Sequence, residues 1–476
     1  MFVSGGGRLG VEGRYDLVVV GLGSGGLVAC DFAARLGLRV AGVEAASPGG
    51  DCLWSGCVPS KSLLAAAKLA HQMRHAGRFG LTASDPDVDL GSVWERIAQL
   101  QEEFARTSDD PKRLEAIGVE VLLGSPGRLV APGTVQVGAR LLRGRRILLC
   151  TGSRPRVPPI PGLEETGYLT SENFFARPAP PRRLTFIGGG PICLELSQAM
   201  RRLGCEVTVL EREGQLLVRE GPELARSLAD VLAEEGVRID LGVQVDRVEM
   251  CGGFKVVHGS QGGVHRRWEA DEIFVGVGRV PRISGLGLEE VRVRVGESGI
   301  LVDAGLRTNL PGIYACGDVT GRFLFTHAAA YEAAQAVRGM FFPGSGRAPT
   351  LVPWCTFTDP ELAHVGMTEA EARAKGQGVR VWGADLEPSD RSRTDRVAIP
   401  KVRLVTARGK LVGAHILGPN AGDVIHELAL AISRRVTIGD LASLVHAYPT
   451  YSGSVGQVAA QAGLDRAHRL RWLVRR

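Results

Sequence analysis

The sequence predicts an α/β protein with two nested Rossmann-like dinucleotide-binding domains, followed by a C-terminal α+β domain. Near the N-terminus, a strand, a glycine-rich turn, a helix and a second strand ending in an acid follow one another, and the pattern returns from Arg182 to Arg212. From about Gly346 the sequence changes to alternating strands and Ala/Leu-rich helices. The length of 476 residues also favours several domains, because one ordinary domain has ~100–200 residues.

Composition and charge exclude several classes of protein. The net charge is +6, from 57 basic and 51 acidic residues without a basic run, so nucleic-acid binding is not expected. No apolar stretch approaches the ~18 residues of a membrane span. The first residues lack the apolar core and cleavage site of a secretory signal, and nine cysteines are an odd number spread over a long chain. We therefore expect a cytoplasmic protein.

The first glycine-rich turn predicts a dinucleotide site. In GLGSGG, Gly21, Gly23 and Gly26 form a G-x-G-x-x-G pattern directly after a strand, and Glu44 follows roughly 20 residues later. Glycines let the backbone approach a pyrophosphate, the helix N-terminus offers free N–H groups, and the acid accepts a hydrogen bond from a ribose hydroxyl.

The second glycine-rich turn predicts another such site with one departure from the pattern. Gly188 and Gly190 occupy the first two positions, but Cys193 stands where a third Gly or Ala is usual. We interpret this cysteine as a slightly larger contact between helix and strand.

The residues after the second unit bear on the choice between NAD and NADP. Glu211 ends the strand, which favours an unphosphorylated ribose and therefore NAD. Arg212 and Arg219 follow closely and could neutralise a 2′-phosphate. NAD is slightly favoured.

The most specific feature is a pair of cysteines, Cys52 and Cys57, in DCLWSGCVPSK at the start of a predicted helix. The pair could be half of a zinc site, but no companion Cys/His pair has suitable local spacing. Two separate packing cysteines are the other alternative. Between two dinucleotide units, and at a helix N-terminus that lowers a thiol pKa, a redox disulfide is favoured.

These motifs together resemble, over nearly the whole chain, the class I pyridine nucleotide-disulfide oxidoreductases, which include dihydrolipoamide dehydrogenase, glutathione reductase and mercuric reductase. The resemblance implies a homodimer that uses FAD and NAD or NADP. It implies domains at residues 1–160 and 285–345 for FAD, 161–284 for NAD(P), and 346–476 for dimerisation.

The resemblance also assigns further cofactor-binding residues. Thr151 and Gly152 in CTGSRP would close the first FAD segment, and Gly278 in GVGRVP would begin the return to the FAD domain. Asp318 in IYACGDV would hold the ribityl chain of the flavin. In FTHAAAYEA, His327 and Ala328 would place a helix N-terminus against the pyrimidine edge of the flavin.

The resemblance assigns catalytic roles in the same way. Cys57 would be the charge-transfer thiol beside the flavin, and Cys52 the interchange thiol that meets the acceptor. Lys61, on the cysteine helix, would pair with Glu195 beside the flavin N5, which also makes Lys61 a cofactor-binding residue. The alternative for this pair is an ordinary solvated ion pair.

One segment departs from the disulfide reductases. In HAYPTYSGS, Tyr448 stands where they carry a catalytic histidine and Gly453 where they carry a glutamate, while His446 lies two positions earlier. Mercuric reductases resemble this chain in having a tyrosine there, but they also carry a vicinal cysteine pair near the C-terminus, which RAHRLRWLVRR lacks.

The main hypothesis is a dihydrolipoamide dehydrogenase-like enzyme that passes electrons to a small-molecule or protein-borne disulfide, or to a metal–thiol acceptor. The alternatives are a mercuric-reductase-like enzyme, a flavin-level quinone reductase or diaphorase, and a non-enzymatic FAD/NAD-binding sensor. We expect no resident metal, because the scattered histidines show no ligand spacing. The seven other cysteines are expected to be mostly buried packing residues.

Overall fold

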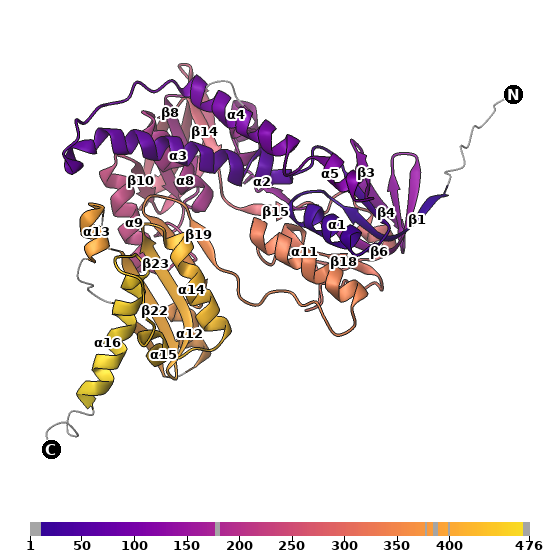
Figure 1. Ribbon diagram of the computed structural model, residues 1–476. Coiled ribbons are helices and arrows are strands. Elements are labelled where there is room, and N and C mark those ends of the chain that lie inside the picture. Colours follow the sequence, from indigo (N-terminus) through magenta and orange to yellow (C-terminus); the bar gives the residue numbers. More distant parts are fainter. Residues whose placement is uncertain (1–10, 177–180, 377, 384–388, 398–399, 470–476) are drawn as a thin grey trace.

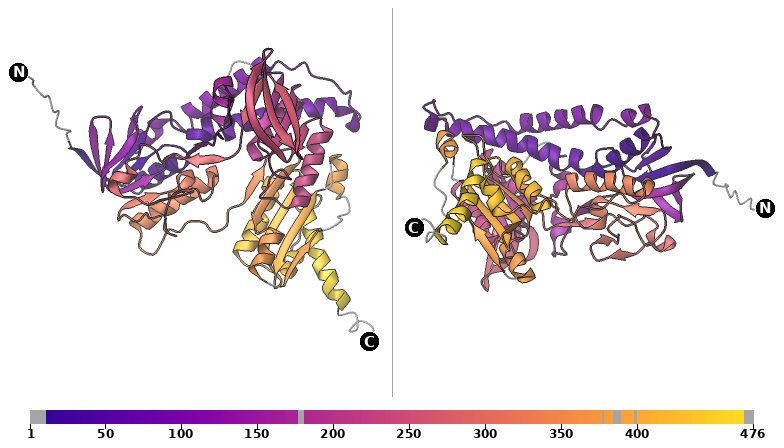
Figure 2. Two further views of the ribbon diagram at one scale, coloured as in Figure 1. Left: turned by 180° about the vertical axis from the view of Figure 1, so that it is seen from behind. Right: turned by 60° about the horizontal axis from the view of Figure 1, so that its bottom comes forward.

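The computed structural model describes residues 11–176, 181–376, 378–383, 389–397 and 400–469. Figure 1 shows the first dinucleotide-binding domain on one side of the molecule, and the second one next to the C-terminal domain on the other side. Two long helices, α3 (Cys57–Arg74) and α4 (Leu90–Arg106), pack together and run along one face, as the right view of Figure 2 also shows.

The first domain is built on a seven-stranded sheet of order β3-β2-β1-β6-β5-β4, with β18 paired to β6. Strands β3, β2, β1, β6 and β18 are parallel, and β4 and β5 form an antiparallel extension. Because β18 comes from a distant part of the chain, the second nucleotide domain is inserted into the first. The elements are β1 (Val11–Val20), α1 (Ser24–Arg35), β2 (Val40–Glu44), β3 (Glu120–Leu123), β4 (Gly127–Ala131), β5 (Thr134–Val137), β6 (Arg140–Leu149), β18 (Ile313–Ala315) and α11 (Thr326–Phe341).

Small residues bring helices α1 and α11 close together beside this sheet. Ala29 and Ala33 of α1 share a fully buried cluster with Ala333 and Ala336 of α11. Close packing of these two helices places the N-terminus of α11 at the end of β18, near the glycine turn that precedes α1.

The second nucleotide domain has a parallel four-stranded sheet of order β10-β9-β8-β14 and a three-stranded antiparallel meander. Its elements are β8 (Arg183–Ile187), α8 (Pro191–Arg202), β9 (Glu206–Glu211), α9 (Pro222–Glu234), β10 (Arg238–Leu241), β11 (Val243–Cys251), β12 (Phe254–Gln261), β13 (Val264–Ala270) and β14 (Glu272–Val275). Strand β15 (Arg279–Pro281) pairs with β7 (Ser153–Pro155) where the chain leaves and re-enters the first domain.

The C-terminal domain is an antiparallel sheet of order β19-β20-β23-β22-β21 packed against helices α14 and α16. Its elements are β19 (Trp354–Thr356), β20 (Glu361–Gly366), α12 (Glu369–Lys375), β21 (Val379–Trp382), α13 (Asp390–Thr394), β22 (Lys401–Ala407), β23 (Lys410–Gly418), α14 (Ala421–Ser433), α15 (Ile438–Ala442) and α16 (Gly453–Arg469). The predicted α/β class with two Rossmann-like domains and an α+β domain is confirmed, while the domain boundaries at 160, 284 and 345 stay predictions.

Two further expectations can be compared with the fold. No helix in the described part of the chain is long and apolar enough to cross a membrane. The expectation of mostly buried additional cysteines does not hold for Cys251, which is exposed because it lies in the last position of β11, at a hairpin turn.

Candidate active site

A continuous cleft of about 1720 Å³ runs through the molecule and is lined by both glycine-rich turns and by the cysteine pair. It passes from the first turn at Gly21 and Gly23, past Cys52 and Cys57, to the second turn at Gly188. Because one cleft contains both predicted dinucleotide sites and both thiols, these groups can take part in one reaction.

The first turn requires glycine at two positions for reasons of backbone geometry. Gly21 has φ +95°, and a Cβ there would lie 2.5 Å from the carbonyl oxygen of Cys150. At Gly26 a Cβ would lie 1.8 Å from the carbonyl oxygen of Gly21, so α1 can pack on the turn only without a side chain. At Gly23 the nearest protein atom would be 3.8 Å away, so this glycine leaves room for a ligand.

Glu44 is held at the end of β2 by the same turn. Its carboxylate accepts hydrogen bonds from the backbone N–H of Leu22 at 2.7 Å and of Ala46 at 2.9 Å. An acid fixed beside a bare glycine turn and a helix N-terminus fits the pyrophosphate and ribose of FAD.

The second turn repeats this geometry and explains the cysteine at its third position. Gly188 has φ +116°, and a Cβ there would lie 2.6 Å from the carbonyl oxygen of Gly276. A Cβ on Gly276 would lie 2.3 Å from the sulfur of Cys193. Gly276 therefore leaves the space that the side chain of Cys193 occupies. This agrees with the interpretation of Cys193 as a slightly larger contact between helix and strand.

The acid of the second unit is anchored like that of the first. The Glu211 carboxylate accepts from the backbone N–H of Gly189 and, at 2.8 Å, from that of Glu213. Arg212 is exposed and pairs with Glu213 at 2.9 Å, while the Arg219 guanidinium lies 4.9 Å from the ring centroid of Trp354.

Asp318 lies where the first domain resumes, at the carboxyl end of β18. Its carboxylate is mostly buried and accepts a hydrogen bond from the hydroxyl of Ser153 at 2.5 Å, with the Arg279 guanidinium 3.8 Å away. Burial raises the pKa of Asp318 above its ordinary value. A buried carboxylate with one side facing the cleft fits a polyhydroxyl chain such as the ribityl group.

The remaining predicted cofactor residues lie along or beside the same cleft. The Thr151 hydroxyl donates to the carbonyl of Arg282 at 2.8 Å. Gly152 and Gly278 have φ +71° and +116° and line the cleft. His327 Nε2 donates to the carbonyl of Pro353 at 2.8 Å.

The two cysteines come from separate helices rather than from one. Cys52 lies in the short helix α2 (Gly50–Trp54), and Cys57 is the first residue of α3. Gly56 separates the helices, and a Cβ there would lie 2.7 Å from the carbonyl oxygen of Asp51. Buried Gln101 of α4 holds the end of α2 by donating to the carbonyls of Leu53 and Trp54, at 3.0 and 2.8 Å.

The environment gives the two thiols opposite acidities. Both cysteines are unbridged in the structure. A hydrogen bond from Cys52, together with Thr326 and the positive charge of Lys61, lowers the pKa of Cys57 to about 6. The hydrogen bond that Cys52 gives to Cys57, and burial, raise the pKa of Cys52. Near neutral pH the pair therefore holds its negative charge on Cys57 and its proton on Cys52.

Thr326 is a site residue that the sequence analysis missed. It is the first residue of α11, and its hydroxyl oxygen lies 3.4 Å from the sulfur of Cys57. The motif FTHAAAYEA contains it, but only the fold shows that this helix begins at the cysteine pair. Ala328 lies buried in the first turn of the same helix.

Lys61 and Glu195 are brought together from α3 and α8. Lys61 Nζ lies 2.6 Å from Glu195 Oε2, and Glu195 Oε1 accepts from the backbone N–H of Phe357 at 2.9 Å. The Glu195 side chain is 8% exposed, so the pair differs from the solvated pair that was the alternative. Both carboxylate oxygens are fixed, which holds the ammonium group close to Cys57.

Tyr448 is not brought to the cysteine pair within one chain. It is 79% exposed, and its hydroxyl donates to Asp390. This hydrogen bond raises the pKa of Tyr448. His446 is turned away into the domain, where its Nε2 lies 3.1 Å from Glu427.

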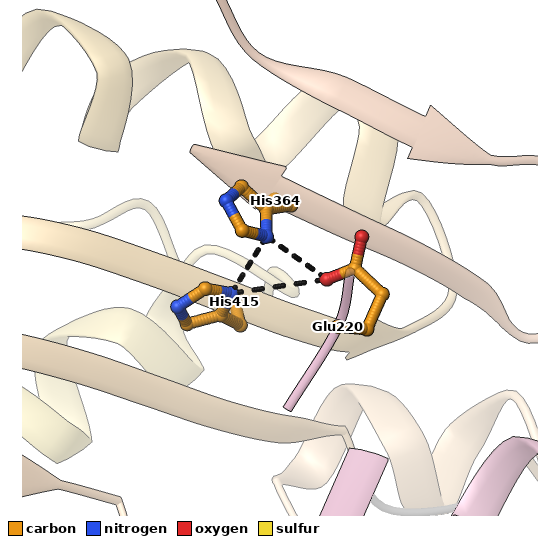
Figure 3. Close-up of side chains that lie close together, drawn as sticks. All are labelled: Glu220, His364 and His415. Carbon is orange, nitrogen blue, oxygen red and sulfur yellow. Dashed lines mark hydrogen bonds and ion pairs between the residues drawn. The ribbon is translucent and has the colours of Figure 1, made fainter. Parts of the chain in front are cut away.

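A buried cluster of Glu220, His364 and His415 was also missed. Figure 3 shows the three side chains turned toward one another. They are the one group of potential metal ligands in the described residues. The expectation of no resident metal stays a prediction from the sequence. Separations of 144 and 51 residues along the chain leave no local spacing by which a sequence could reveal them.

Comparisons with known proteins agree with this geometry. The family model "Pyridine nucleotide-disulphide oxidoreductase" matches residues 15–333, and the model of the dimerisation domain of that family matches residues 352–459. The chain belongs to this family. It is therefore a flavoprotein oxidoreductase that uses FAD and a pyridine nucleotide, and it contains the family's dimerisation domain.

Relatives of this pyridine nucleotide-disulphide oxidoreductase differ in activity. It is 35% identical to a mercuric reductase of Bacillus cereus over 92% of this chain and 70% of that protein. It is also 35% identical to a dihydrolipoyl dehydrogenase of Thermus scotoductus, over 94% of this chain and 96% of that protein. A glutathione reductase of Burkholderia cepacia is 35% identical to this chain, over 92% of this chain and 96% of that protein.

A solved structure supports the fold of the whole chain. The HOCl-induced flavoprotein disulfide reductase RclA from Escherichia coli has a TM-score of 0.82 and 25% identity, over 94% of this chain and 99% of that one. Its Cu(II) complex has a TM-score of 0.83 and 25% identity, over 93% and 99%.

Proposed function

We propose that this oxidoreductase carries electrons from NAD(P)H to a disulfide acceptor through the Cys52–Cys57 pair. The observation that supports it best is the cysteine pair itself, with its low thiol pKa at Cys57 and Lys61 close by, in a cleft lined by both glycine turns. A dihydrolipoamide dehydrogenase-like reaction on a small-molecule or protein-borne disulfide follows from this arrangement.

FAD would be held by the first turn, by Glu44 and by Asp318. Bound FAD supplies the hydride and electron-pair chemistry that links the pyridine nucleotide to the cysteines. Thr151, Gly152, Gly278, His327 and Ala328 complete the lining along the flavin. Lys61, fixed by Glu195, supplies a positive charge beside the reacting groups.

The reduced cysteine pair then reduces the acceptor by thiol–disulfide exchange. Cys52 loses its proton and its sulfur attacks one sulfur of the acceptor disulfide, which breaks the acceptor S–S bond and releases the first thiol. The Cys57 thiolate attacks the mixed disulfide at Cys52, forms the Cys52–Cys57 bond and releases the second thiol. The acceptor gains two electrons and two protons, one proton from Cys52 and one from solvent, and the cysteine pair is oxidised.

For the nucleotide, we propose NADH in preference to NADPH. The Glu211 carboxylate is fixed by two backbone N–H groups at the end of β9, where it repels a 2′-phosphate. Arg212 pairs with Glu213, and the guanidinium of Arg219 lies over the ring of Trp354. Both arginines therefore have other partners than the 2′-phosphate of NADPH.

We propose a homodimer in which Tyr448 faces the active site of the partner. The segment that carries it exposes Leu444 at 50%, Val445 at 92% and Tyr448 at 79%, which is unusual for apolar residues unless another surface covers them. A phenol with a raised pKa can donate a hydrogen bond but is a weak base. The expected cytoplasmic location stays a prediction from the sequence.

A mercuric-reductase-like reaction on a metal–thiol acceptor is the second candidate. Tyr448 in place of the histidine, and the likeness to the mercuric reductase of Bacillus cereus, favour it. A thiol-bound metal ion needs no proton shuttle from a His–Glu pair.

The test is anaerobic oxidation of NADH and of NADPH with lipoamide or thiol-complexed Hg(II) as sole acceptor. Fast turnover of NADH with lipoamide, lost in Cys52→Ser, supports the disulfide reaction. Turnover with Hg(II) alone overturns it in favour of the second candidate. Full activity of Cys52→Ser with both acceptors would leave only a flavin-level diaphorase.

A further inference from the structure

The buried cluster of Glu220, His364 and His415 takes no part in the proposed electron path, and it joins two domains. His364 of β20 and His415 of β23 are directly opposed partners in the antiparallel sheet, so their side chains share one face. Glu220 comes from the segment between β9 and α9 of the second nucleotide domain. The three residues are 1%, 4% and 6% exposed, in the order His364, His415, Glu220.

Hydrogen bonds fix which ring nitrogens carry protons. His364 Nε2 lies 3.0 Å from the carbonyl oxygen of Gly366, and His415 Nε2 lies 3.2 Å from that of Met367. A carbonyl can only accept, so each Nε2 carries a hydrogen and each neutral ring presents a lone pair at Nδ1. With both rings neutral, the two Nδ1 atoms face each other and the Glu220 carboxylate as acceptors, so either a metal ion or a shared proton must lie between them.

We propose that these three side chains bind a zinc ion. The distances are 2.9 Å from His364 Nδ1 to Glu220 Oε2, 3.1 Å between the two Nδ1 atoms, and 4.0 Å from His415 Nδ1 to the same Oε2. The three atoms are close enough together for one ion to lie ~2.0–2.2 Å from all of them, which is the length of zinc bonds to imidazole nitrogen and carboxylate oxygen. Figure 3 shows these three atoms facing one another.

Neighbouring groups hydrogen-bond to the proposed ligands and hold them in position, as is usual at metal sites. Ligating histidines usually donate their other N–H to a carbonyl, and both histidines do so here. Trp354 Nε1 donates to the second oxygen of Glu220 at 2.6 Å, and its ring stacks on His364 at a centroid distance of 3.7 Å. Two imidazoles and one carboxylate suit zinc rather than the oxygen-only sites of calcium or magnesium.

The position of the site indicates what zinc would do. Glu220 follows Arg219 and lies near the end of the loop that connects Glu211 to α9. Both histidines belong to the sheet of the dimerisation domain. A bound ion would tie the nucleotide-binding loop to that sheet. It would stabilise the folded protein and fix the position of the loop, without contacting the cysteine pair.

The experiment measures zinc in a background without the cysteine pair, so that zinc binding to Cys52 and Cys57 cannot contribute. Cys52→Ser/Cys57→Ser protein is purified with FAD, loaded with Zn(II), dialysed and analysed by mass spectrometry of the metal. We expect one zinc per chain and a higher melting temperature than in metal-free protein. Adding Glu220→Gln, whose amide can donate to the free Nδ1 atoms, should reduce the zinc to background.

Two further measurements keep the proposal falsifiable if Glu220→Gln folds poorly. Trp354→Phe keeps the stacked ring but removes the hydrogen bond to Glu220, and it should weaken zinc binding by ~10–100-fold. Co(II) should give visible ligand-field bands without a thiolate charge-transfer band. Zinc content at background in the protein without the cysteine pair, with a proton on His364 instead, would overturn the proposal, as would equal zinc content in all variants. Since the redox pair is absent from these variants, these outcomes are independent of the proposed electron path.

Discussion

The substitution Gly190→Ala separates nucleotide binding from folding. A Cβ at Gly190 would come no closer than 4.0 Å to any protein atom, the nearest being the carbonyl oxygen of Gly276. The added methyl group therefore fits the protein alone but occupies space at the N-terminus of α8, where the pyrophosphate of the nucleotide is expected.

The size of the effect follows from forcing a methyl group into a close contact. Overpacking of this kind costs ~1–3 kcal/mol, which corresponds to an increase in KM for NADH of roughly 5- to 150-fold. The content of FAD and the melting temperature should stay unchanged. Gly188→Ala should instead destabilise the domain, because Gly188 has φ +116° and a Cβ there would lie 2.6 Å from Gly276.

The assay is steady-state NADH oxidation with ferricyanide, which bypasses the cysteine pair, together with FAD absorbance and thermal unfolding. The control is Gly214→Ala in the same domain, where no protein atom lies within 4 Å of the new Cβ and no positive φ is needed. An unchanged KM in Gly190→Ala would refute the placement of the nucleotide at this turn.

Three other predictions concern the active site. Lys61→Met should raise the pKa of Cys57 above about 6, because the ammonium charge helps to lower it; alkylation of the reduced pair by iodoacetamide as a function of pH should show the midpoint moving upward, and an unmoved midpoint would show that Lys61 does not act on this thiol. Glu211→Ala should shift the ratio of kcat/KM for NADPH over NADH upward by about tenfold, or ~1.4 kcal/mol; an unchanged ratio would count against the proposed repulsion of the 2′-phosphate. Tyr448→His should raise lipoamide turnover by less than about tenfold, because Gly453 leaves the imidazole without an orienting carboxylate; unchanged kinetics would argue against any role of this position.

Local patterns in the sequence were sufficient to predict the nucleotide turns and the cysteine pair. Strand, turn and helix in these units are neighbours in the chain, so the positions of Gly21, Gly26 and Gly188 follow from steric rules that act over a few residues. The cysteines lie five positions apart and carry their chemistry in their spacing. The packing of Cys193 depends on Gly276, which is distant in the chain. The sequence could therefore predict that the turn accepts a cysteine at this position, but not which residue makes room for it.

Contacts between distant elements could not be predicted in the same way. Thr326 reaches Cys57 because α11 packs on α1, and this packing depends on alanines that look like ordinary helix residues. His364 and His415 meet because β20 and β23 pair in one register. Neither the register nor the approach of Glu220 from another domain leaves a local signal in the sequence.

The central claim is that Cys52 and Cys57 store one electron pair in addition to that stored by the flavin. The most direct measurement is an anaerobic titration of the FAD-containing protein with dithionite, followed by absorbance and by counting free thiols. The account predicts that the wild-type protein takes up two electron pairs per chain and gains two thiols, whereas Cys52→Ser takes up only one pair. Uptake of a single pair by the wild-type protein, with no gain in thiols, would contradict it.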